Sequence, residues 1–302
     1  MTTTVLVAGA SGMLGNRVAA HLLDQSDADV RLLLRESVPS DPGKAVTIRA
    51  LTDRGAVVVV GDVTDPSSLA DATEGVDTVV SALQGGEAVL VNGQVALATA
   101  AADRGVRRFL TSDFAIDLFA ATEVGPQFEV RRRAAAAIDA LPMEVVHVLN
   151  GVFMDGMLDP AQPGLLDVGT GTVMLWGSGD EPFDATTVKD TARFTARVAT
   201  DPEDRSGVRY VSGSRTSWNE VIALTEKLTG RTFTRNVVGD AHSLRQVVTQ
   251  AEDPWSVVMQ WYALAMLTTP PFPTTENDRY PDARPTTVQD YLADAHAALE
   301  QA

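Results

Sequence analysis

The sequence contains no cysteine, and only three of its 24 basic residues are lysines, at Lys44, Lys189 and Lys227. The missing cysteine excludes disulfide bonds, thiolate nucleophiles and cysteine-ligated metal sites. The scarcity of lysine leaves few candidates for a mechanism in which a lysine side chain exchanges protons. No apolar run approaches the ~18 to 20 residues that span a bilayer, so we expect no membrane contact.

Positive charge is also scarce, because the formal net charge is -16 at pH 7. A surface this negative repels phosphate backbones, and no basic stripe reverses it locally, so we expect no nucleic-acid partner. The four histidines are scattered without the spacing of metal ligands, and we expect no metal site. The first residues, "MTTT", carry no basic region of a secretory signal, which predicts a cytoplasmic location. The oligomeric state stays open.

What the first half does contain is a regular alternation of short apolar runs and amphipathic segments. This alternation is typical of a parallel sheet covered by helices on both faces. It predicts an α/β, doubly wound domain of the Rossmann type over residues 1–153. The predicted strands cover residues 4–10, 29–36, 55–65, 76–83, 106–114 and 143–153. The predicted helices cover residues 13–25, 66–75, 90–105 and 129–142.

Beyond Phe153 the alternation ends. Residues 159–184 are rich in Gly, Pro and Asp, as loops and short strands tend to be. We expect a second, smaller α+β lobe over residues 154–302 that binds the substrate, with segments crossing back to the first domain. Its predicted helices cover residues 188–201, 217–230, 251–273 and 286–299.

Three glycines follow the first strand in "VLVAGASGMLG". Between a strand and a helix, one glycine permits a tight turn, another lets a pyrophosphate approach the backbone, and the third lets helix and strand pack closely. The helix then presents unpaired N–H groups and the positive end of its dipole to the phosphates. The alternative is a plain strand-to-helix turn. The predicted phosphate-binding residues are Gly9, Ser11, Gly12, Met13, Leu14 and Gly15.

The end of the second strand indicates which dinucleotide is bound. An acidic residue there would bind the ribose hydroxyls of NAD, but this chain has Arg35, 20 residues after Gly15. A guanidinium pairs well with a 2′-phosphate, which favours NADP(H) as the cofactor. The alternative is that Arg35 lies in solvent while Glu36 serves NAD.

Further cofactor contacts are expected where other strands end. Asp62 follows the third strand and would lie near the adenine, unless it only caps the helix after Pro66. The ends of the fourth and fifth strands meet the cofactor at the carboxyl edge of the sheet. The residues predicted there are Ser81, Ala82, Leu83 and Ser112.

Several motifs in fixed order resemble the NmrA-like and isoflavone-reductase-like group of atypical short-chain dehydrogenases. They are "GASGMLGNRVAAHLL", "LLLRES", "GDVTDPSSL", "VDTVVSAL", "RRFLTSDF", "FEVRRRAAAAIDALPMEVVHVLNGVFM" and "RPTTVQDYLADA". The resemblance implies an NADP(H)-bound Rossmann lobe and a variable lobe that form a cleft for a small, often aromatic, substrate. It also implies that the Tyr-x-x-x-Lys pair of ordinary short-chain dehydrogenases is absent, and no tyrosine of this chain has a lysine four residues later.

The chain departs from this family at one position. Isoflavone-reductase-like enzymes place a lysine on the helix after the fifth strand, and Arg131 takes its position here. A guanidinium, with a pKa above ~12, does not exchange protons near neutrality, but it donates hydrogen bonds. Arg131 is therefore a candidate catalytic residue that binds a substrate oxygen, a substrate carboxylate or the nicotinamide ribose. The alternative is a solvated helix face, which we expect for Arg132 and Arg133.

Other cleft residues follow from the position of ligands beyond the carboxyl ends of parallel strands. Asp113 is a candidate proton relay, with helix or loop capping as the alternative, and His147 is expected to be a buried core histidine. Trp176 and Trp261 would suit the walls of a site for a planar substrate, or else they belong to the core. The predicted substrate-binding residues are Phe114, Asn150, Val152, Phe153, Trp176 and Trp261.

These observations favour an NADP(H)-dependent oxidoreductase that transfers hydride to a small carbonyl, enone, quinone or aromatic substrate, with the cofactor supplying the difficult chemistry. Quinones demand least from a protein proton donor. Two alternatives stay open. The chain is a non-catalytic, NmrA-like protein that senses NADP, or it is a non-redox enzyme of cyclisation or rearrangement that retains the fold.

Overall fold

The computed structural model describes residues 2–25, 28–37, 41–159, 166–167 and 169–300. Contacts divide the chain into two compact units. Unit 1 comprises Met1–Phe114, Val130–Val148 and Thr191–Arg209, and unit 2 comprises Ala115–Glu129, Leu149–Asp190 and Tyr210–Ala302. The units are of nearly equal length, and their limits differ from the predicted ranges 1–153 and 154–302. The difference arises because Ala115–Glu129 leaves the first unit early and Thr191–Arg209 returns to it.

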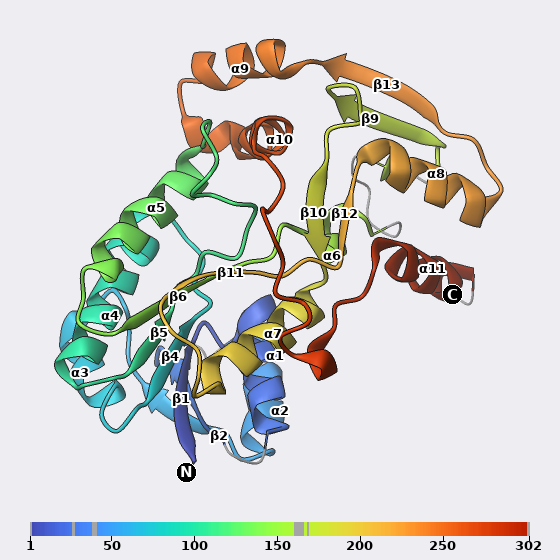
Figure 1. Ribbon diagram of the computed structural model, residues 1–302. Coiled ribbons are helices and arrows are strands. Elements are labelled where there is room, and N and C mark those ends of the chain that lie inside the picture. The colour runs from blue at the N-terminus through green and yellow to red at the C-terminus, as the bar shows by residue number, and fades with distance from the viewer. Residues whose placement is uncertain (1, 26–27, 38–40, 160–165, 168, 301–302) are drawn as a thin grey trace. The chain divides into compact units, whose positions relative to one another are not determined.

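Unit 1 is built on a seven-stranded sheet of order β11-β6-β5-β4-β1-β2-β3 (Figure 1). Its strands are β1 (Thr3–Ala8), β2 (Ala28–Leu34), β3 (Val57–Val60), β4 (Thr78–Ser81), β5 (Arg108–Leu110), β6 (Glu144–Leu149) and β11 (Gly207–Tyr210). The pairs from β3 to β6 are all parallel. Since β1 lies between β2 and β4, the strand order reverses beside it. Open α/β sheets bind ligands at such a switch point.

Helices cover both faces of this sheet. They are α1 (Met13–Leu23), α2 (Pro42–Thr52), α3 (Leu69–Ala72), α4 (Gln94–Asp103), α5 (Pro126–Asp139) and α7 (Val188–Thr200). Helices α3, α4 and α5 lie on one face, while α1, α2 and α7 lie on the other (Figure 1). Side chains of the first group, among them Leu97 and Ile138, pack with Phe109 of β5 in one buried cluster. The predicted doubly wound α/β fold is confirmed.

Two helices of unit 1 differ from the prediction. Helix α2 was not predicted, although Pro42 stands at its first position and the Asp41 carboxylate accepts hydrogen bonds from the N–H groups of Gly43 (3.0 Å) and Lys44 (3.2 Å). The helix predicted over residues 66–75 is reduced to α3 and a preceding 3-10 turn at Pro66–Ser68. A proline followed by small polar residues starts a turn as readily as a long helix.

The segment that returns to unit 1 is held by a buried arginine. Arg108 of β5 has no exposed surface, and its guanidinium donates to the carbonyls of Val198 (2.9 Å), Asp201 (2.8 Å) and Asp204 (2.7 Å). It also pairs with the Glu144 carboxylate at 2.9 Å. One side chain thus donates to three backbone acceptors of the returning segment and ties that segment to β5.

Unit 2 contains two small sheets of order β12-β10-β7 and β13-β9-β8. Its strands are β7 (Val152–Phe153), β8 (Leu166–Asp167), β9 (Thr172–Trp176), β10 (Phe183–Thr186), β12 (Ser214–Thr216) and β13 (Thr234–Gly239). Its helices are α6 (Met154–Met157), α8 (Trp218–Thr229), α9 (Ala241–Gln250), α10 (Val258–Thr268) and α11 (Val288–Glu300). Helix α9 was not predicted, and the helix predicted over 251–273 is shortened to α10.

Local sequence explains where α8 starts and stops. Ser217 and Glu220 form a capping box at its first turn, and Gly230 ends it with a φ of +66°. Only glycine adopts this left-handed conformation without steric cost. Within the described part of the chain, no helix is both long enough and apolar enough to cross a membrane.

Candidate functional site

The glycine turn after β1 contains two glycines that packing requires and one that it does not. Gly9 has a φ of +86°, and a Cβ there would collide with the carbonyl oxygen of Ala82. A Cβ on Gly15 would collide with the carbonyl of Gly9 in the same way. A Cβ on Gly12 would meet only the Gly9 oxygen, at 3.2 Å, and its backbone is extended. Gly12 therefore leaves its outer side open to a ligand.

Helix α1 begins at this turn without a side-chain cap. Gly12 is its N-cap residue, no side chain accepts from its first N–H groups, and its first turn holds no acidic residue. Met13 follows with 56% of its surface exposed, and Ser11 is half-buried. Free N–H groups at a helix start carry a positive partial charge that suits an anion. The turn and the helix start together fit a phosphate group.

The two predicted residues at the ends of β2 and β3 differ in what they contact. Arg35 follows β2 directly and its side chain is exposed. Asp62 uses its carboxylate locally, because Oδ1 accepts from the N–H (2.9 Å) and the hydroxyl (2.8 Å) of Thr64. The turn at Pro66 is capped by Asp65 instead, which accepts from the Ser67 N–H at 3.2 Å. Asp62 thus shapes the loop after β3, and its adenine contact stays a prediction.

The predicted residues at the ends of β4 and β5 are joined in one network with the glycine turn. Ala82 packs against Gly9 and donates its N–H to the carbonyl of Ala8 at 2.8 Å. The carbonyl of Leu83 accepts from the Ser112 hydroxyl at 2.6 Å. Ser81 is buried, and within the described residues its hydroxyl finds no partner. The carboxyl ends of β1, β4 and β5 are therefore in direct contact.

Arg131 lies over the end of β5. Its Nε donates to the carbonyl oxygen of Ser112 at 3.1 Å, and the Ser112 N–H in turn donates to Gln94 Oε1 at 2.9 Å. Arg133 points elsewhere and forms an exposed ion pair with Glu87 at 2.7 Å, which lowers the pKa of that carboxyl. Arg132 is half-buried. Arg131 thus contacts the predicted cofactor edge at Ser112.

Asp113 and His147 form a buried pair that joins β5 to β6. The Asp113 side chain is fully buried, and its Oδ2 lies 2.7 Å from His147 Nδ1 and 2.6 Å from the Thr111 hydroxyl, which donates to it. His147 Nε2 lies 3.0 Å from Oδ1 of Asp139, at the end of α5. His147 is buried as predicted, but it is part of a charged network. Asp113 binds this network and not a helix or loop terminus.

The two carboxylates change the protonation of His147. Burial lowers the pKa of its imidazole, and the hydrogen bonds and charges of Asp113 and Asp139 more than reverse that effect, so the pKa lies above its ordinary value of 6.5. Each ring nitrogen faces a carboxylate oxygen, so both nitrogens donate. The position of His147 between two carboxylates thus favours the imidazolium form.

Five of the six predicted substrate-binding residues lie in unit 2, and Phe114 lies in unit 1. Asn150 is buried, with Nδ2 donating to the Gly151 carbonyl at 3.2 Å and no partner for Oδ1 among the described residues. Val152 and Phe153 form β7 beside β10. Trp176 and Trp261 pack against a cluster of Leu244, Val248 and Leu264, as the alternative of a core role predicted.

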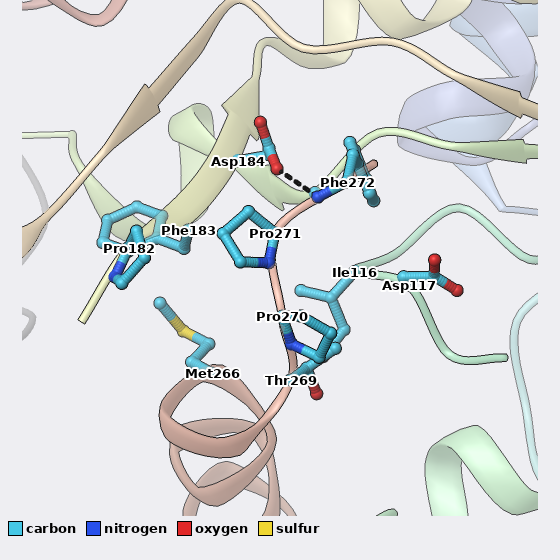
Figure 2. Close-up of a pocket in the computed structure, with 11 residues that line it drawn as sticks. Ile116, Asp117, Pro182, Phe183, Asp184, Met266, Thr269, Pro270, Pro271 and Phe272 are labelled. Carbon is cyan, nitrogen blue, oxygen red and sulfur yellow. Dashed lines mark hydrogen bonds between the residues drawn. The ribbon is translucent and has the colours of Figure 1, made fainter. Parts of the chain in front are cut away.

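Unit 2 also contains a small pocket that the sequence did not reveal (Figure 2). Its walls are mainly apolar, and the buried Asp184 carboxylate lies among them, accepting from the N–H of Phe272 at 2.8 Å. Phe272 lies in the irregular segment that follows α10. The lining residues are Ile116, Asp117, Gly151, Pro182, Phe183, Asp184, Met266, Thr269, Pro270, Pro271 and Phe272.

Asp117 is the second carboxylate of this pocket, and its oxygens are already bound. Oδ1 accepts from the N–H groups of Phe119 and Ala120, and Oδ2 accepts from the Tyr210 hydroxyl at 2.9 Å. Burial and the hydrogen bond to Asp117 raise the pKa of Tyr210 to about 12. Tyr210 is therefore a hydrogen-bond donor at neutral pH, while Oδ2 of Asp184 binds the Phe272 N–H and lies 3.4 Å from the Arg215 guanidinium.

What was missed depends on backbone contacts that only the structure shows. Gly151 stands directly between the predicted residues Asn150 and Val152, and its φ of +71° brings it against the backbone of Asp184. The pairing of Asp113 with His147 follows from the register of β5 and β6, in which Leu110 lies beside Val146. Within the described part of the chain, no cluster of His, Asp and Glu side chains is arranged to hold a metal ion.

Comparison with known proteins agrees with this architecture. The model of the NmrA-like family matches residues 1–292. An isoflavone reductase homolog of Zea mays is 28% identical over 95% of this chain and 96% of its own. The crystal structure of an isoflavone reductase superimposes with a TM-score of 0.84 at 23% identity, covering 97% of this chain and 99% of that one. A complex of leucoanthocyanidin reductase with NADPH from Vitis vinifera gives 0.82 at 24% identity, covering 97% and 99%. The resemblance seen in the motifs is confirmed, and the chain belongs to the NmrA-like family.

Proposed function

We propose that the chain is an NADP(H)-dependent reductase that acts on a small carbonyl, enone, quinone or aromatic compound. The observation that carries the proposal is the open glycine turn at the switch point of the sheet. Gly12 leaves room for a ligand beside an uncapped helix start, whereas neighbouring backbone atoms occupy the space beside Gly9 and Gly15. A bound nicotinamide cofactor would supply the hydride.

The residues around this turn fit NADP(H) in charge as well as in shape. The backbone from Gly9 to Gly15 and the start of α1 would hold the pyrophosphate. Arg35 is exposed after β2 and would pair with the 2′-phosphate, which NAD lacks. Ala82, Leu83 and Ser112 would line the cofactor at the ends of β4 and β5. The relative from Vitis vinifera binds NADPH in its own structure, which supports the assignment.

The pocket of unit 2 supports an aromatic or quinone-like substrate. Ile116, Phe183, Met266 and Phe272 provide flat apolar walls, and such walls with one or two fixed polar groups are typical of small-molecule sites. Asp184 would orient a substrate that carries a hydrogen-bond donor. The solved relatives are named isoflavone reductase and leucoanthocyanidin reductase, which supports this substrate class.

Arg131 would act through the position of its positive charge. Its hydrogen bond to the Ser112 carbonyl keeps a permanent positive charge at the end of β5. Such a charge stabilises an oxygen on which negative charge develops during reduction. Because the guanidinium keeps its proton, Arg131 would not supply the proton that the reduced substrate takes up.

Calorimetry with NADPH and with NADH, followed by absorbance of the reduced nicotinamide, tests the proposal. The absorbance is followed with a panel of quinones, enones and aromatic ketones. We expect micromolar binding of NADPH and its consumption by at least one acceptor. Arg131→Ala should lose turnover while it still binds NADPH, and Arg133→Ala is the matched control on the exposed side of the same helix. Failure to bind either dinucleotide contradicts the proposal.

One observation favours a second function. The family lysine is replaced by Arg131, whose Nε contacts backbone, as expected of a protein that binds NADP(H) and senses it without consuming it. Tight binding of NADPH, with no consumption by any member of the panel, would favour this function.

A further inference from the structure

We propose that Asp113 and His147 share the proton that the reduced substrate takes up, and that Asp139 is a positioning residue that holds His147 in its donating orientation. The proposal rests on the reductase function proposed above and assigns its missing proton donor. It starts from a chemical gap, because Arg131 occupies the position of the family lysine and does not release a proton.

The geometry gives one continuous network of three side chains from three elements. Asp113 at the end of β5 contacts His147 of β6 at 2.7 Å, and His147 contacts Asp139 of α5 at 3.0 Å. The Thr111 hydroxyl donates to the same oxygen of Asp113. Asp113 and His147 are buried, whereas 52% of the Asp139 side chain is exposed. Asp113 faces His147 from the end of β5, and Asp139 faces it from α5.

One oxygen of Asp113 is not used by this network. Oδ1 is buried and has no partner in the described part of the chain. A buried carboxylate oxygen without a donor is costly, and such atoms mark places where a ligand or a proton is received. Asp113 directly follows Ser112, whose backbone and hydroxyl join the ends of β4 and β5. The unused oxygen thus belongs to the residue that follows Ser112, and we place the reacting substrate oxygen beside it.

The proton balance is simple. Reduction of a carbonyl adds a hydride to carbon, for which the nicotinamide cofactor is the source, and a proton to oxygen. His147 gives its Nδ1 proton to Oδ2 of the Asp113 carboxylate, and rotation of the resulting carboxyl group carries this proton to the substrate oxygen. The pair then holds one proton fewer, with neutral His147 keeping Nε2–H toward Asp139. One proton from solvent restores the pair after the product leaves.

Substrates of different basicity separate this role from a structural one. A ketone reduced by hydride becomes a strongly basic alkoxide that needs an acid, whereas a quinone becomes a hydroquinone anion that does not. Positioned acids contribute about 100-fold or more to such steps. For His147→Gln we expect kcat to fall about 100-fold with a ketone or enone, and less than about 3-fold with a quinone. NADPH affinity should stay unchanged.

A second variant keeps the test valid where His147→Gln fails to fold. Asp139→Asn alters an exposed side chain and removes one of the two charges that favour the imidazolium. The fall of ketone turnover at high pH should move to lower pH in this variant. Asp103→Asn, at the exposed end of α4, is the matched control and should leave the profile of the wild type unchanged.

The outcomes are distinct. An unchanged ratio of ketone to quinone turnover in His147→Gln overturns the proton role, and so does an unchanged pH profile in Asp139→Asn. If the wild type binds no NADPH, or consumes none with any acceptor, the proposed function fails first and the proton role fails with it. Binding of NADPH, measured on the same samples, tells these cases apart.

Discussion

The Nε of Arg131 lies 3.1 Å from the carbonyl oxygen of Ser112 and donates a hydrogen bond to it. This contact ties α5 to the end of β5, and Gln94 holds the N–H of the same serine from α4. Three elements thus meet at one residue that the sequence placed at the cofactor. The arginine that replaces the family lysine therefore has a specific contact of its own, the hydrogen bond to Ser112.

Removal of this contact should destabilise the protein. A hydrogen bond from a charged donor to a buried carbonyl contributes about 1.5 to 3 kcal/mol, so we expect a loss of this size for Arg131→Ala in urea unfolding. Arg131→Lys should lose less, because an ammonium group still donates but lacks the planar fork. Arg133→Ala, which removes an exposed ion pair, should lose clearly less than Arg131→Ala. An equal loss of unfolding free energy in Arg131→Ala and Arg133→Ala would contradict a stabilising contact between Arg131 and Ser112.

The glycines of the turn should respond differently to alanine. Gly12→Ala meets only one atom at 3.2 Å and should fold, while its Cβ fills the space of the phosphate and lowers NADPH affinity by about tenfold or more. Gly9→Ala combines a positive φ with a backbone collision and should not give a stable fold. Circular dichroism and calorimetry separate the two effects. Full NADPH affinity in a folded Gly12→Ala protein would argue against the phosphate site.

Arg35 should decide between the two dinucleotides. Charge-assisted hydrogen bonds to a 2′-phosphate contribute about 1.5 to 3 kcal/mol, so Arg35→Ala should weaken NADPH about 10- to 100-fold and leave NADH unchanged. Arg49→Ala is the control, since it removes the same charge from an exposed position on α2. Parallel loss of affinity for both dinucleotides would instead indicate a general electrostatic effect.

Arg108 provides a test of the fold that is independent of any ligand. Arg108→Met leaves three backbone carbonyls and part of the Glu144 charge without their donor, and breaking a buried pair of this kind costs about 3 to 5 kcal/mol. Arg107→Met is a close control. Its guanidinium also contacts Glu144 at 2.9 Å, but 39% of its side chain is exposed, so we expect a loss of about 1 kcal/mol or less. Similar unfolding midpoints for both variants would contradict this account.

The strands β1 to β6 of unit 1 were predictable because they are largely apolar and alternate with amphipathic helices, whereas β11, which comes from the second half of the chain, was not predicted. Helix α2 was missed because its cap, Asp41, follows a stretch without periodic apolar residues. The residues at which the two units begin and end could also not be predicted from the sequence pattern. Ala115–Glu129 leaves unit 1 between a strand and a helix that both belong to it, and only contacts that are distant in sequence show this.

The candidate site was predictable where a motif defines the backbone, as in the glycine turn. It was less predictable where function depends on pairing across strands. Asp113 and His147 are 34 residues apart and meet only because β5 and β6 are neighbours in register. The pocket around Asp184 draws on segments from Ile116 to Phe272, and no local pattern connects them. Sequence patterns describe one segment at a time, whereas these features arise from tertiary contacts.

The raised pKa of His147 predicts how stability depends on pH. A histidine whose folded pKa lies above its ordinary value of 6.5 stabilises the folded state fully below that pH. This contribution is lost as pH rises from 6.5 through the folded pKa, because the proton then leaves the folded protein. We therefore expect the free energy of unfolding of the wild type to decline over this range in urea titrations at closely spaced pH values.

Substitution of His147 should remove that decline. His147→Gln is not titratable, so its free energy of unfolding should be lower than that of the wild type at pH 6 and should vary less above it. His242→Gln is the matched control, because it removes an exposed histidine whose ring nitrogen lies 3.2 Å from the side-chain amide of Gln246. A decline that persists unchanged in His147→Gln would mean that other groups cause it and that the buried imidazolium does not stabilise the fold.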